Sequence, residues 1–153
     1  MSRHTYTAET LWERGTQPFL DKRYSRRVLL RFDGGLTVAG SSSPNVVPPP
    51  CSDPSAIDPE EALVSALSSC HMLWFLDIAS RHGFVVDSYH DEASGVMTAN
   101  ERRKLWLSSV TLSPKVVFSG AALPTPAEIE RMHHEAHDRS EEHTSELQSH
   151  HDL

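Results

Sequence analysis

The feature that most constrains the fold is a long apolar segment that follows Asp58. Asp58 is a good N-cap, Pro59 suits the first helical position, and Glu60 and Glu61 place negative charge where the helix dipole favours it. Apolar residues then recur at intervals of three and four, which predicts a helix. They are Ala62, Leu63, Ala66, Leu67, Cys70, Leu73, Trp74 and Ile78. More apolar residues lie on its other sides, so we expect a central, mostly buried helix that ends near Gly83.

The rest of the chain is predicted to form mostly strands. Apolar runs bounded by turn residues predict strands over residues 6–12, 24–32, 36–39, 85–97 and 105–118. Asp33-Gly34-Gly35 predicts a hairpin, and Thr125-Pro126-Ala127-Glu128 is a capping box that starts a second helix. Five prolines in residues 41–56 predict a long loop. This order indicates an α+β fold with helices packed on antiparallel sheet.

Composition bounds the function. A chain of 153 residues, of which 38% are hydrophobic, can build one domain around one core. The net charge of −7 argues against nucleic acid and anionic membranes as partners. We find no signal peptide and expect no apolar run of membrane-spanning length. Two cysteines, Cys51 and Cys70, do not make a secreted disulfide framework, so we expect a cytoplasmic protein.

The spacing around Cys70 resembles a known family. Cys70 lies ten residues after Glu60, behind an Asp-Pro-Glu start and a helix rich in small residues. This stretch resembles the central helix of the OsmC/Ohr family, the osmotically inducible and organic hydroperoxide resistance proteins. Further segments resemble the family in the same order: Tyr24-Ser25-Arg26, Phe32-Asp33-Gly34-Gly35, Ser41-Ser42-Ser43-Pro44, Asp87-Ser88-Tyr89, Leu112 to Pro114 and His133 to His137. The resemblance covers roughly residues 4 to 139.

The resemblance implies both a fold and an activity. The fold would be OsmC-like, with antiparallel sheets wrapped around long central helices in an intertwined homodimer. The activity would be that of a thiol-dependent peroxidase, which reduces organic hydroperoxides and is reduced in turn by a dithiol. No cofactor and no metal is implied.

The resemblance assigns catalytic roles to Cys70, Arg26 and Glu60. Cys70 would be the peroxidatic cysteine, which must react as a thiolate, whereas a free thiol has a pKa near ~8.5. Because the helix dipole acts mainly in the first turn, a nearby cation is required. Arg26 matches the functional arginine of the family, although Arg23, Arg27 and Arg31 leave the choice open. Glu60 would orient that arginine through a salt bridge.

Geometry constrains how these residues could meet. On one straight helix, residues 60 and 70 lie about 15 Å apart along the axis and point about 80° apart. They cannot both surround one peroxide from such a helix. Either the chain bends near Pro59, or the site is completed across the dimer.

Each candidate also has a simpler interpretation. Without the resemblance, Cys70 is a small core residue, Arg26 a solvated edge arginine and Glu60 a charge that stabilises the helix start. Cys51 is interpreted as incidental. His133 and His137 have the i, i+4 spacing of metal ligands, but no HExxH pattern surrounds them, so a solvated or hydrogen-bonded face is favoured.

The chain departs from the family after Arg139. There the family has the resolving cysteine and an apolar strand, whereas this chain continues with Ser140 and a polar segment that resembles a translated sequencing adapter. We expect an OsmC-like domain over residues 1–139 that lacks its final strand, and a non-native or disordered tail over 140–153. The alternative is a natural, divergent tail. Whether this chain is active is left open, since it could instead be a catalytically impaired binding or stress-response module. A metal-binding protein that uses the histidine-rich C-terminus is a further rival.

Overall fold

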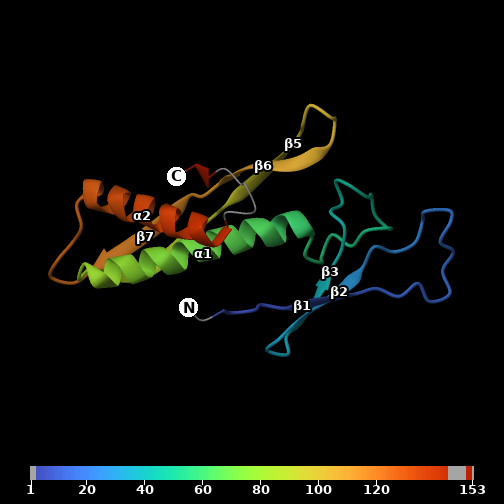
Figure 1. Cartoon of the computed structure of the whole chain (residues 1–153), viewed down its shortest axis with the longest axis horizontal. Helices are drawn as coiled ribbons and strands as arrows, with labels where there is room; N and C mark the ends of the chain where they lie inside the picture. Colours follow the sequence, from blue (N-terminus) through green and yellow to red (C-terminus); the bar gives the residue numbers. More distant parts are fainter. Residues whose placement is uncertain (1–2, 145–150, 153) are drawn as a thin grey trace. The chain divides into compact units, whose positions relative to one another are not determined.

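The computed structural model describes residues 3–144 and 151–152. The chain divides into two compact units, residues 1–62 and residues 63–153. Figure 1 labels the helices and strands of both units.

The first unit contains a three-stranded antiparallel sheet in the order β1-β2-β3. Its strands are β1 (Ala8–Leu11), β2 (Val28–Phe32) and β3 (Thr37–Gly40). The predicted hairpin between β2 and β3 is confirmed, and Gly35 supplies the positive φ, 97°, that its turn requires. β2 begins at Val28, so Tyr24 to Arg27 precede the strand instead of belonging to it. The proline-rich segment 41–56 forms a loop without regular strands.

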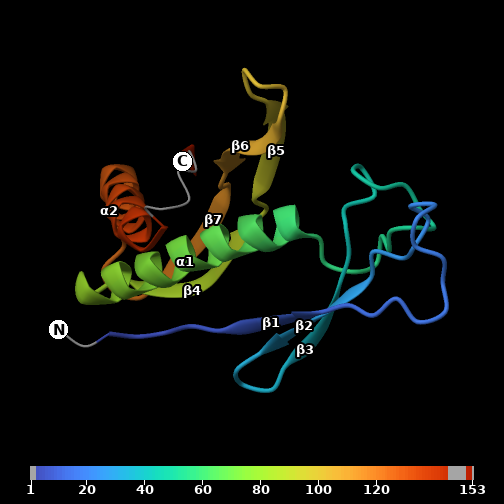
Figure 2. The same cartoon turned by 45° about the vertical axis from the view of Figure 1, so that its right-hand side comes forward.

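The second unit begins inside the first helix, α1 (Pro59–Arg81). It continues through β4 (Val85–Asp91), β5 (Ser94–Ala99), β6 (Leu105–Thr111), β7 (Pro114–Ser119), α2 (Pro126–Thr144) and β8 (His151–Asp152). β4 pairs with β7 and β5 with β6, both antiparallel, while β8 pairs with β6 in parallel. In Figures 1 and 2, α1 and α2 run beside the β4–β7 pair.

Residues 85–97 and 105–118 form strands as expected, and each run divides into two. The breaks fall after Asp91 and before Pro114. At this point the Asp91 carboxylate accepts a hydrogen bond from the backbone N–H of Ser113, at 2.6 Å, and another from the Ser68 hydroxyl. The Asp91 side chain thus binds the backbone N–H of Ser113, which in a continuous strand would donate to the neighbouring strand.

Capping boxes fix the start of both helices. The Asp58 carboxylate accepts the Glu61 N–H while the Glu61 carboxylate accepts the Asp58 N–H, both at 2.8 Å. Thr125 and Glu128 exchange the same pair of bonds at the start of α2, as predicted. The hydrogen bonds from Thr125 lower the pKa of Glu128 below its ordinary value. α1 ends at Arg81, close to Gly83, which has a φ of 79°.

Two apolar clusters form the core of the second unit. The larger joins Phe75, Ile78 and Ala79 of α1 to Met132 and Ala136 of α2. Side chains of β4 and β7 pack against this cluster, including Val86 and Phe118. The smaller cluster joins Leu67 of α1 to Val110 and Leu112.

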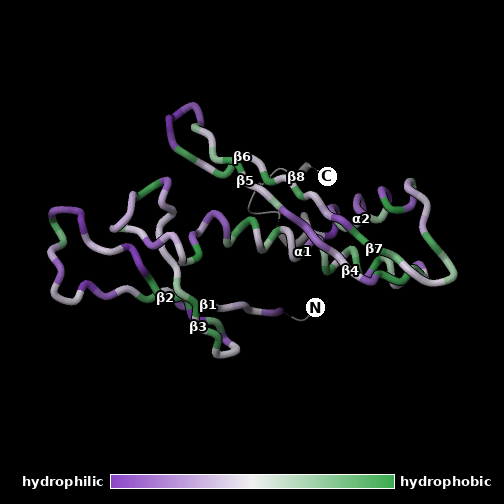
Figure 3. The backbone as a smooth tube through the Cα atoms, turned by 180° about the vertical axis from the view of Figure 1, so that it is seen from behind, coloured by the Kyte–Doolittle hydropathy of each residue, from purple (hydrophilic) through white to green (hydrophobic). Residues whose placement is uncertain are grey.

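The buried face of α1 differs from the predicted one. Its buried residues are Leu67, His71, Phe75, Ile78 and Ala79. Leu73, which the helical spacing places on the main apolar stripe, is 62% exposed, and Cys70 is only half-buried. The expectation that this helix is mostly buried is therefore wrong for a single chain. Because α1 is apolar on most of its turns (Figure 3), periodicity could not select the face that is covered.

α1 also corrects the expectation about membrane-spanning length. By length and composition alone it could cross a bilayer, since an 18-residue window has a mean hydropathy of 1.5. The core helix of a soluble protein passes the same test, so this is weak evidence for a membrane span.

The expected boundary at residue 139 falls inside α2, which continues to Thr144. Ser140 is 2% exposed, so the helix still packs there. His151 and Asp152 pair with Val110 and Thr111 of β6. Residues 145–150 and 153, on which much of the expectation about the tail depends, lie outside the described residues.

Candidate functional site

Arg26 is held in one orientation by its own segment of chain. Its backbone N–H donates to the carbonyl of Cys51 at 2.8 Å. One guanidinium nitrogen donates to the carbonyl oxygens of Lys22, at 2.8 Å, and Tyr24, at 2.5 Å. The guanidinium carbon also lies 3.7 Å from the centroid of the Tyr24 ring, a cation–π geometry. These contacts fix the position of the positive charge.

Three aromatic rings support this arrangement. Tyr24 stacks on Phe19 with ring centroids 4.6 Å apart, and Trp12 meets Tyr24 edge-on at 5.5 Å. The Trp12 indole N–H donates to the carbonyl of Ser25 at 2.8 Å. The segment before β2 is therefore anchored on both sides of Tyr24.

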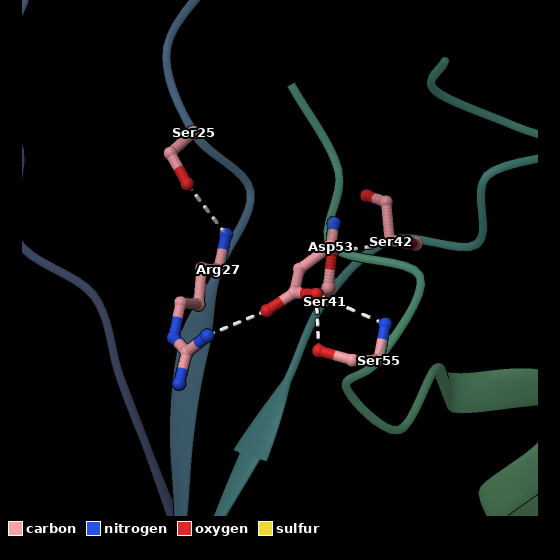
Figure 4. A network of polar contacts seen from close by, with 6 residues as sticks. All are labelled: Ser25, Arg27, Ser41, Ser42, Asp53 and Ser55. Carbon is pink, nitrogen blue, oxygen red and sulfur yellow. Dashed lines mark hydrogen bonds and ion pairs between the residues drawn. The ribbon is translucent and has the colours of Figure 1, made fainter. Parts of the chain in front are cut away.

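A polar network ties the proline-rich loop to the start of β2 (Figure 4). Arg27 forms an ion pair with Asp53. The same carboxylate accepts hydrogen bonds from the hydroxyl and N–H of Ser55, at 2.6 and 2.9 Å. The N–H of Asp53 donates to the Ser41 hydroxyl at 2.9 Å. The hydrogen bonds from Ser55, with a smaller contribution from Arg27, lower the pKa of Asp53. This network holds the loop beside Arg26.

Arg26 lies at the wall of an open cavity of about 510 Å³ in the first unit. The cavity is lined mostly by apolar side chains, and Arg26 and Asp58 are its charged residues. Its lining comprises Thr10, Trp12, Tyr24, Arg26, Val28, Leu30, Gly40, Ser41, Ser42, Ile57, Asp58, Pro59 and Ala62. Asp58 already accepts the N–H of Glu61. Among the described residues, no carboxylate forms an ion pair with Arg26. The cavity thus combines apolar walls with one cation that is not neutralised by a salt bridge.

Glu60 lies in the first turn of α1, in the same unit as Arg26. Within residues 3–144, the expected salt bridge between them is not formed. The Oε2 atom of Glu60 is buried and has no hydrogen-bond partner in this part of the chain. A buried carboxylate oxygen without a partner is costly, so this group favours the approach of a donor.

Cys70 belongs to the second unit, where it lies half-buried in α1. It is a free thiol, as is Cys51. Cys51 lies beside the segment that contains Arg23 and Arg26, and its thiol contacts the carbonyl of Arg23 at 3.3 Å.

Sequence reasoning missed two contacts. The first is the contact by which Tyr24 holds Arg26. The two residues are close in the sequence, but this closeness alone does not predict the contact. The second is a pair of histidines, His71 and His133, whose Nε2 and Nδ1 atoms lie 3.0 Å apart. His71 continues the helical spacing of Leu67 and Phe75, so the periodicity contained this signal.

The histidine-rich helix does not assemble a metal site in the part of the chain that is described. There, no three His, Cys, Asp or Glu side chains gather in a way that could hold a metal ion.

Comparison with known proteins decides the family. The sequence pattern of the OsmC-like protein family matches residues 52–143, which is more than half of the chain. The chain belongs to this family. An OsmC-like protein of unknown function from Vibrio cholerae is 42% identical in sequence, with a TM-score of 0.93 over 97% of both chains. No curated protein matches the chain.

More distant OsmC-like structures share the fold. An organic hydroperoxide resistance protein from Legionella pneumophila is 14% identical and has a TM-score of 0.70, over 100% of this chain and 97% of that chain. A putative organic hydroperoxide resistance protein from Vibrio cholerae, solved with captopril in one of its active sites, is 13% identical. It covers 98% of this chain and 90% of that chain, with a TM-score of 0.67. The expected α+β, OsmC-like fold is therefore confirmed.

Proposed function

We propose that this OsmC-like protein reduces organic hydroperoxides through the thiol of Cys70. Arg26 stabilises the thiolate, and Glu60 orients Arg26. The observation that carries the proposal is the cavity of the first unit, where apolar walls meet the rigidly held Arg26, which forms no salt bridge with any described residue. Apolar walls suit the organic part of a hydroperoxide, and a guanidinium can stabilise a thiolate and donate hydrogen bonds to a peroxide.

The chemistry needs only the thiol and an external dithiol. The Cys70 thiolate attacks the distal peroxide oxygen, so that the S–O bond forms while the O–O bond breaks. The alkoxide takes up a proton and leaves as the alcohol, and Cys70 becomes a sulfenic acid. One thiol of the dithiol then condenses with the sulfenic acid and releases water. The second thiol of the dithiol then attacks this mixed disulfide, which releases the Cys70 thiol and converts the dithiol to an internal disulfide.

A homodimer completes the site in this proposal. Only 28% of the apolar window of α1 is buried within one chain, and Leu73 is 62% exposed on it. Burying this surface against a second copy would be favourable at about 25 cal/mol per Å². Cys70 of one copy would then lie close to Arg26 of the other copy. Association of the two copies would also bring Glu60 close to Arg26. This is the second of the two arrangements that helix geometry leaves open.

The proposal is tested by turnover of an organic hydroperoxide with dithiothreitol. We expect Cys70→Ser to abolish turnover and Cys51→Ser to keep it. Arg26→Ala should slow alkylation of Cys70 at pH 7, because the variant lacks the positive charge that is proposed to stabilise the reactive thiolate. Arg31 is an exposed arginine on β2, and Arg31→Ala is the matched control. Retained turnover in Cys70→Ser, or a larger loss in Arg31→Ala than in Arg26→Ala, would contradict the assignment.

The second candidate is a catalytically impaired OsmC-fold module that serves binding or the stress response. It is favoured by Ser140, which follows Arg139 where the family resemblance puts the resolving cysteine. In that case one equivalent of hydroperoxide would convert Cys70 to the sulfenic acid without further turnover. A sulfenic-acid probe and mass spectrometry separate the two candidates.

The setting of the proposed reaction is the cytoplasm. Both cysteines are free thiols, which suits a reducing compartment. The partners proposed are a second copy of the chain, an organic hydroperoxide and a dithiol, with neither nucleic acid nor a membrane.

A further inference from the structure

The second unit contains a histidine pair that the proposed peroxidase chemistry does not use. His71 of α1 and His133 of α2 lie with their rings almost parallel, at an interplanar angle of 8° and a centroid distance of 5.3 Å. Nε2 of His71 and Nδ1 of His133 are 3.0 Å apart, a hydrogen-bond distance. His71 is only 1% exposed, and Phe75 stacks on the other ring at 4.2 Å. The pair joins the two helices within their shared core.

The contact sets a limit on how many protons the pair can hold. A neutral imidazole has one N–H donor and one acceptor nitrogen, so two neutral rings share one N–H···N bond. One added proton keeps that bond but places a positive charge in the core. A second added proton would turn two N–H groups toward each other at 3.0 Å, which the contact does not allow. Protonation therefore works against the packing of α2 on α1.

The surrounding charges oppose one another, and burial decides the balance. Burial lowers the pKa of His133 below its ordinary value of 6.5, and His134 lowers it further. Asp91 of β4 acts in the opposite direction, but its carboxylate already accepts hydrogen bonds from Ser68 and Ser113.

In the described part of the chain, the other titratable groups near the pair include members of α2 and β4, and Cys70 of α1 directly precedes His71. Glu130 and His134 of α2 line the same cavity as His133, and His137 follows one turn later. Tyr89 of β4 packs against Phe75. Burial, and to a smaller extent the charge of Asp91, raise the pKa of Tyr89, so this side chain stays neutral. From the β6–β7 side, the cavity is lined by Leu112, Ser113 and Pro114, none of which titrates.

Among the described residues, the side of the pair that faces a cavity is that of His133. His133 lines an open cavity of about 460 Å³ between α2 and the β6–β7 turn, whereas His71 is sealed in the core. His133 is therefore the member that exchanges protons with solvent.

We infer that His71 and His133 form an acid-sensitive latch between α1 and α2, which holds α2 in place near neutral pH and loosens it in mild acid. This inference goes beyond the proposed peroxidase function and does not depend on it. The apolar contacts of Met132 and Ala136 persist in acid, so α2 is loosened without unfolding of the whole unit. The linkage between proton binding and folding stability has the direction that the latch requires. A histidine with a lowered folded pKa binds fewer protons folded than unfolded, so its stabilisation is present above pH 6.5 and is lost as the pH falls through the folded pKa.

Hydrogen exchange of the α2 amides at pH 7.5 and pH 5.5, corrected for the intrinsic exchange rate, tests the latch. We expect exchange in α2 of the unmodified protein to rise several-fold at the lower pH. His133→Gln keeps a hydrogen-bonding group beside His71 but does not titrate, so its α2 exchange should change little with pH. His134→Gln, an exposed neighbour, is the control and should behave like the unmodified protein.

A second measurement needs no variant. Imidazole resonances of the unmodified protein, followed by NMR against pH, should show one histidine that titrates below the ordinary value together with α2 shifts. Equal rises of α2 exchange in His133→Gln and the unmodified protein would overturn the latch. So would a titration of His133 at or above 6.5.

Discussion

Tyr24 contacts Arg26 twice, through its ring, whose centroid lies 3.7 Å from the guanidinium carbon, and through its carbonyl, which accepts a guanidinium N–H. The backbone contact survives any substitution at position 24, whereas the ring contact does not. Tyr24 is therefore a positioning residue that can be tested separately from the charge of Arg26.

Replacing Tyr24 with Leu should lower hydroperoxide turnover while Arg26 is still present. A cation–π contact of about 0.5–2 kcal/mol corresponds to about a 2- to 30-fold change in the population of the held guanidinium. Tyr24→Phe keeps the ring and should retain most of the rate. Steady-state kinetics with an organic hydroperoxide measure the difference. Equal rates in Tyr24→Leu and Tyr24→Phe would remove the positioning role.

Replacing Leu73 with Glu should separate the proposed dimer. Leu73 is 62% exposed in a single chain, so a charge there costs the isolated chain little. The same charge would be buried if two α1 helices pack together, which is strongly unfavourable without a partner charge. Sedimentation should show a monomer for Leu73→Glu and a dimer for Asp138→Lys, an exposed change on α2. A dimer that survives Leu73→Glu would place the interface elsewhere.

Acid should loosen the loop over residues 41–56 through Asp53. The folded pKa of Asp53 is lowered by hydrogen bonds from Ser55, so its stabilising effect is present above the ordinary value of 3.8 and is lost as the pH falls through the lowered value. Asp53→Ala should make the loop sensitive to proteolysis already at pH 7. Asp33→Ala, in the exposed β2–β3 turn, should not. A protease-resistant loop in Asp53→Ala would show that the prolines alone hold it.

Gly95→Ala should destabilise the second unit. A Cβ at this position of β5 would lie 2.7 Å from Val64 Cγ2 and 2.8 Å from Leu107 Cδ1, closer than real contacts. Overpacking of this kind costs about 1–3 kcal/mol of unfolding free energy. Gly34→Ala, where a Cβ would meet no atom within 4 Å, should be close to neutral. Urea unfolding compares the two, and similar midpoints would contradict the prediction.

Because α2 continues to Thr144, we propose that residues 145–153, instead of the expected 140–153, are not native to the fold, and that the two-residue pairing of β8 with β6 adds little stability. Truncation after Thr144 should then leave the melting temperature almost unchanged. Truncation after Arg139 should lower it, because it removes Ser140, which is 2% exposed in α2. If truncation after Thr144 strongly destabilises the protein, the tail belongs to the fold. As a further check, Ser140→Cys should restore dithiol-driven turnover if this position is where the family's resolving thiol acts.

Local signals predicted where most elements lie. The Asp-Gly turn of the first hairpin and the Thr125–Glu128 capping box are decided by neighbouring residues, and both are confirmed. The divisions of residues 85–97 and 105–118 were not predicted, because they depend on the Asp91 carboxylate reaching Ser113, 22 residues away. A contact of this sequence separation leaves no mark in a local pattern.

The candidate site was predictable only in its residue types. The resemblance selected Cys70, Arg26 and Glu60, and these remain proposals. The rings that hold Arg26 come from residues 12–24, between β1 and β2. The apolar cavity beside it is lined by residues of β1, β2, the proline-rich loop and the start of α1. No single segment contains that arrangement.

The sequence by itself determined that α1 forms, where it begins and that it is apolar on nearly every side, since these properties follow from Asp58, its capping partner Glu61 and composition. Only the tertiary structure decided which face of α1 is covered. The face through Leu67, His71 and Phe75 packs inside the unit, while Leu73 remains exposed. The physical reason is that a helix without a polar side has no intrinsic preference for one face. The choice is made by the partners it packs against, α2 and the β4–β7 sheet, and these include a histidine pair joined from positions 62 residues apart.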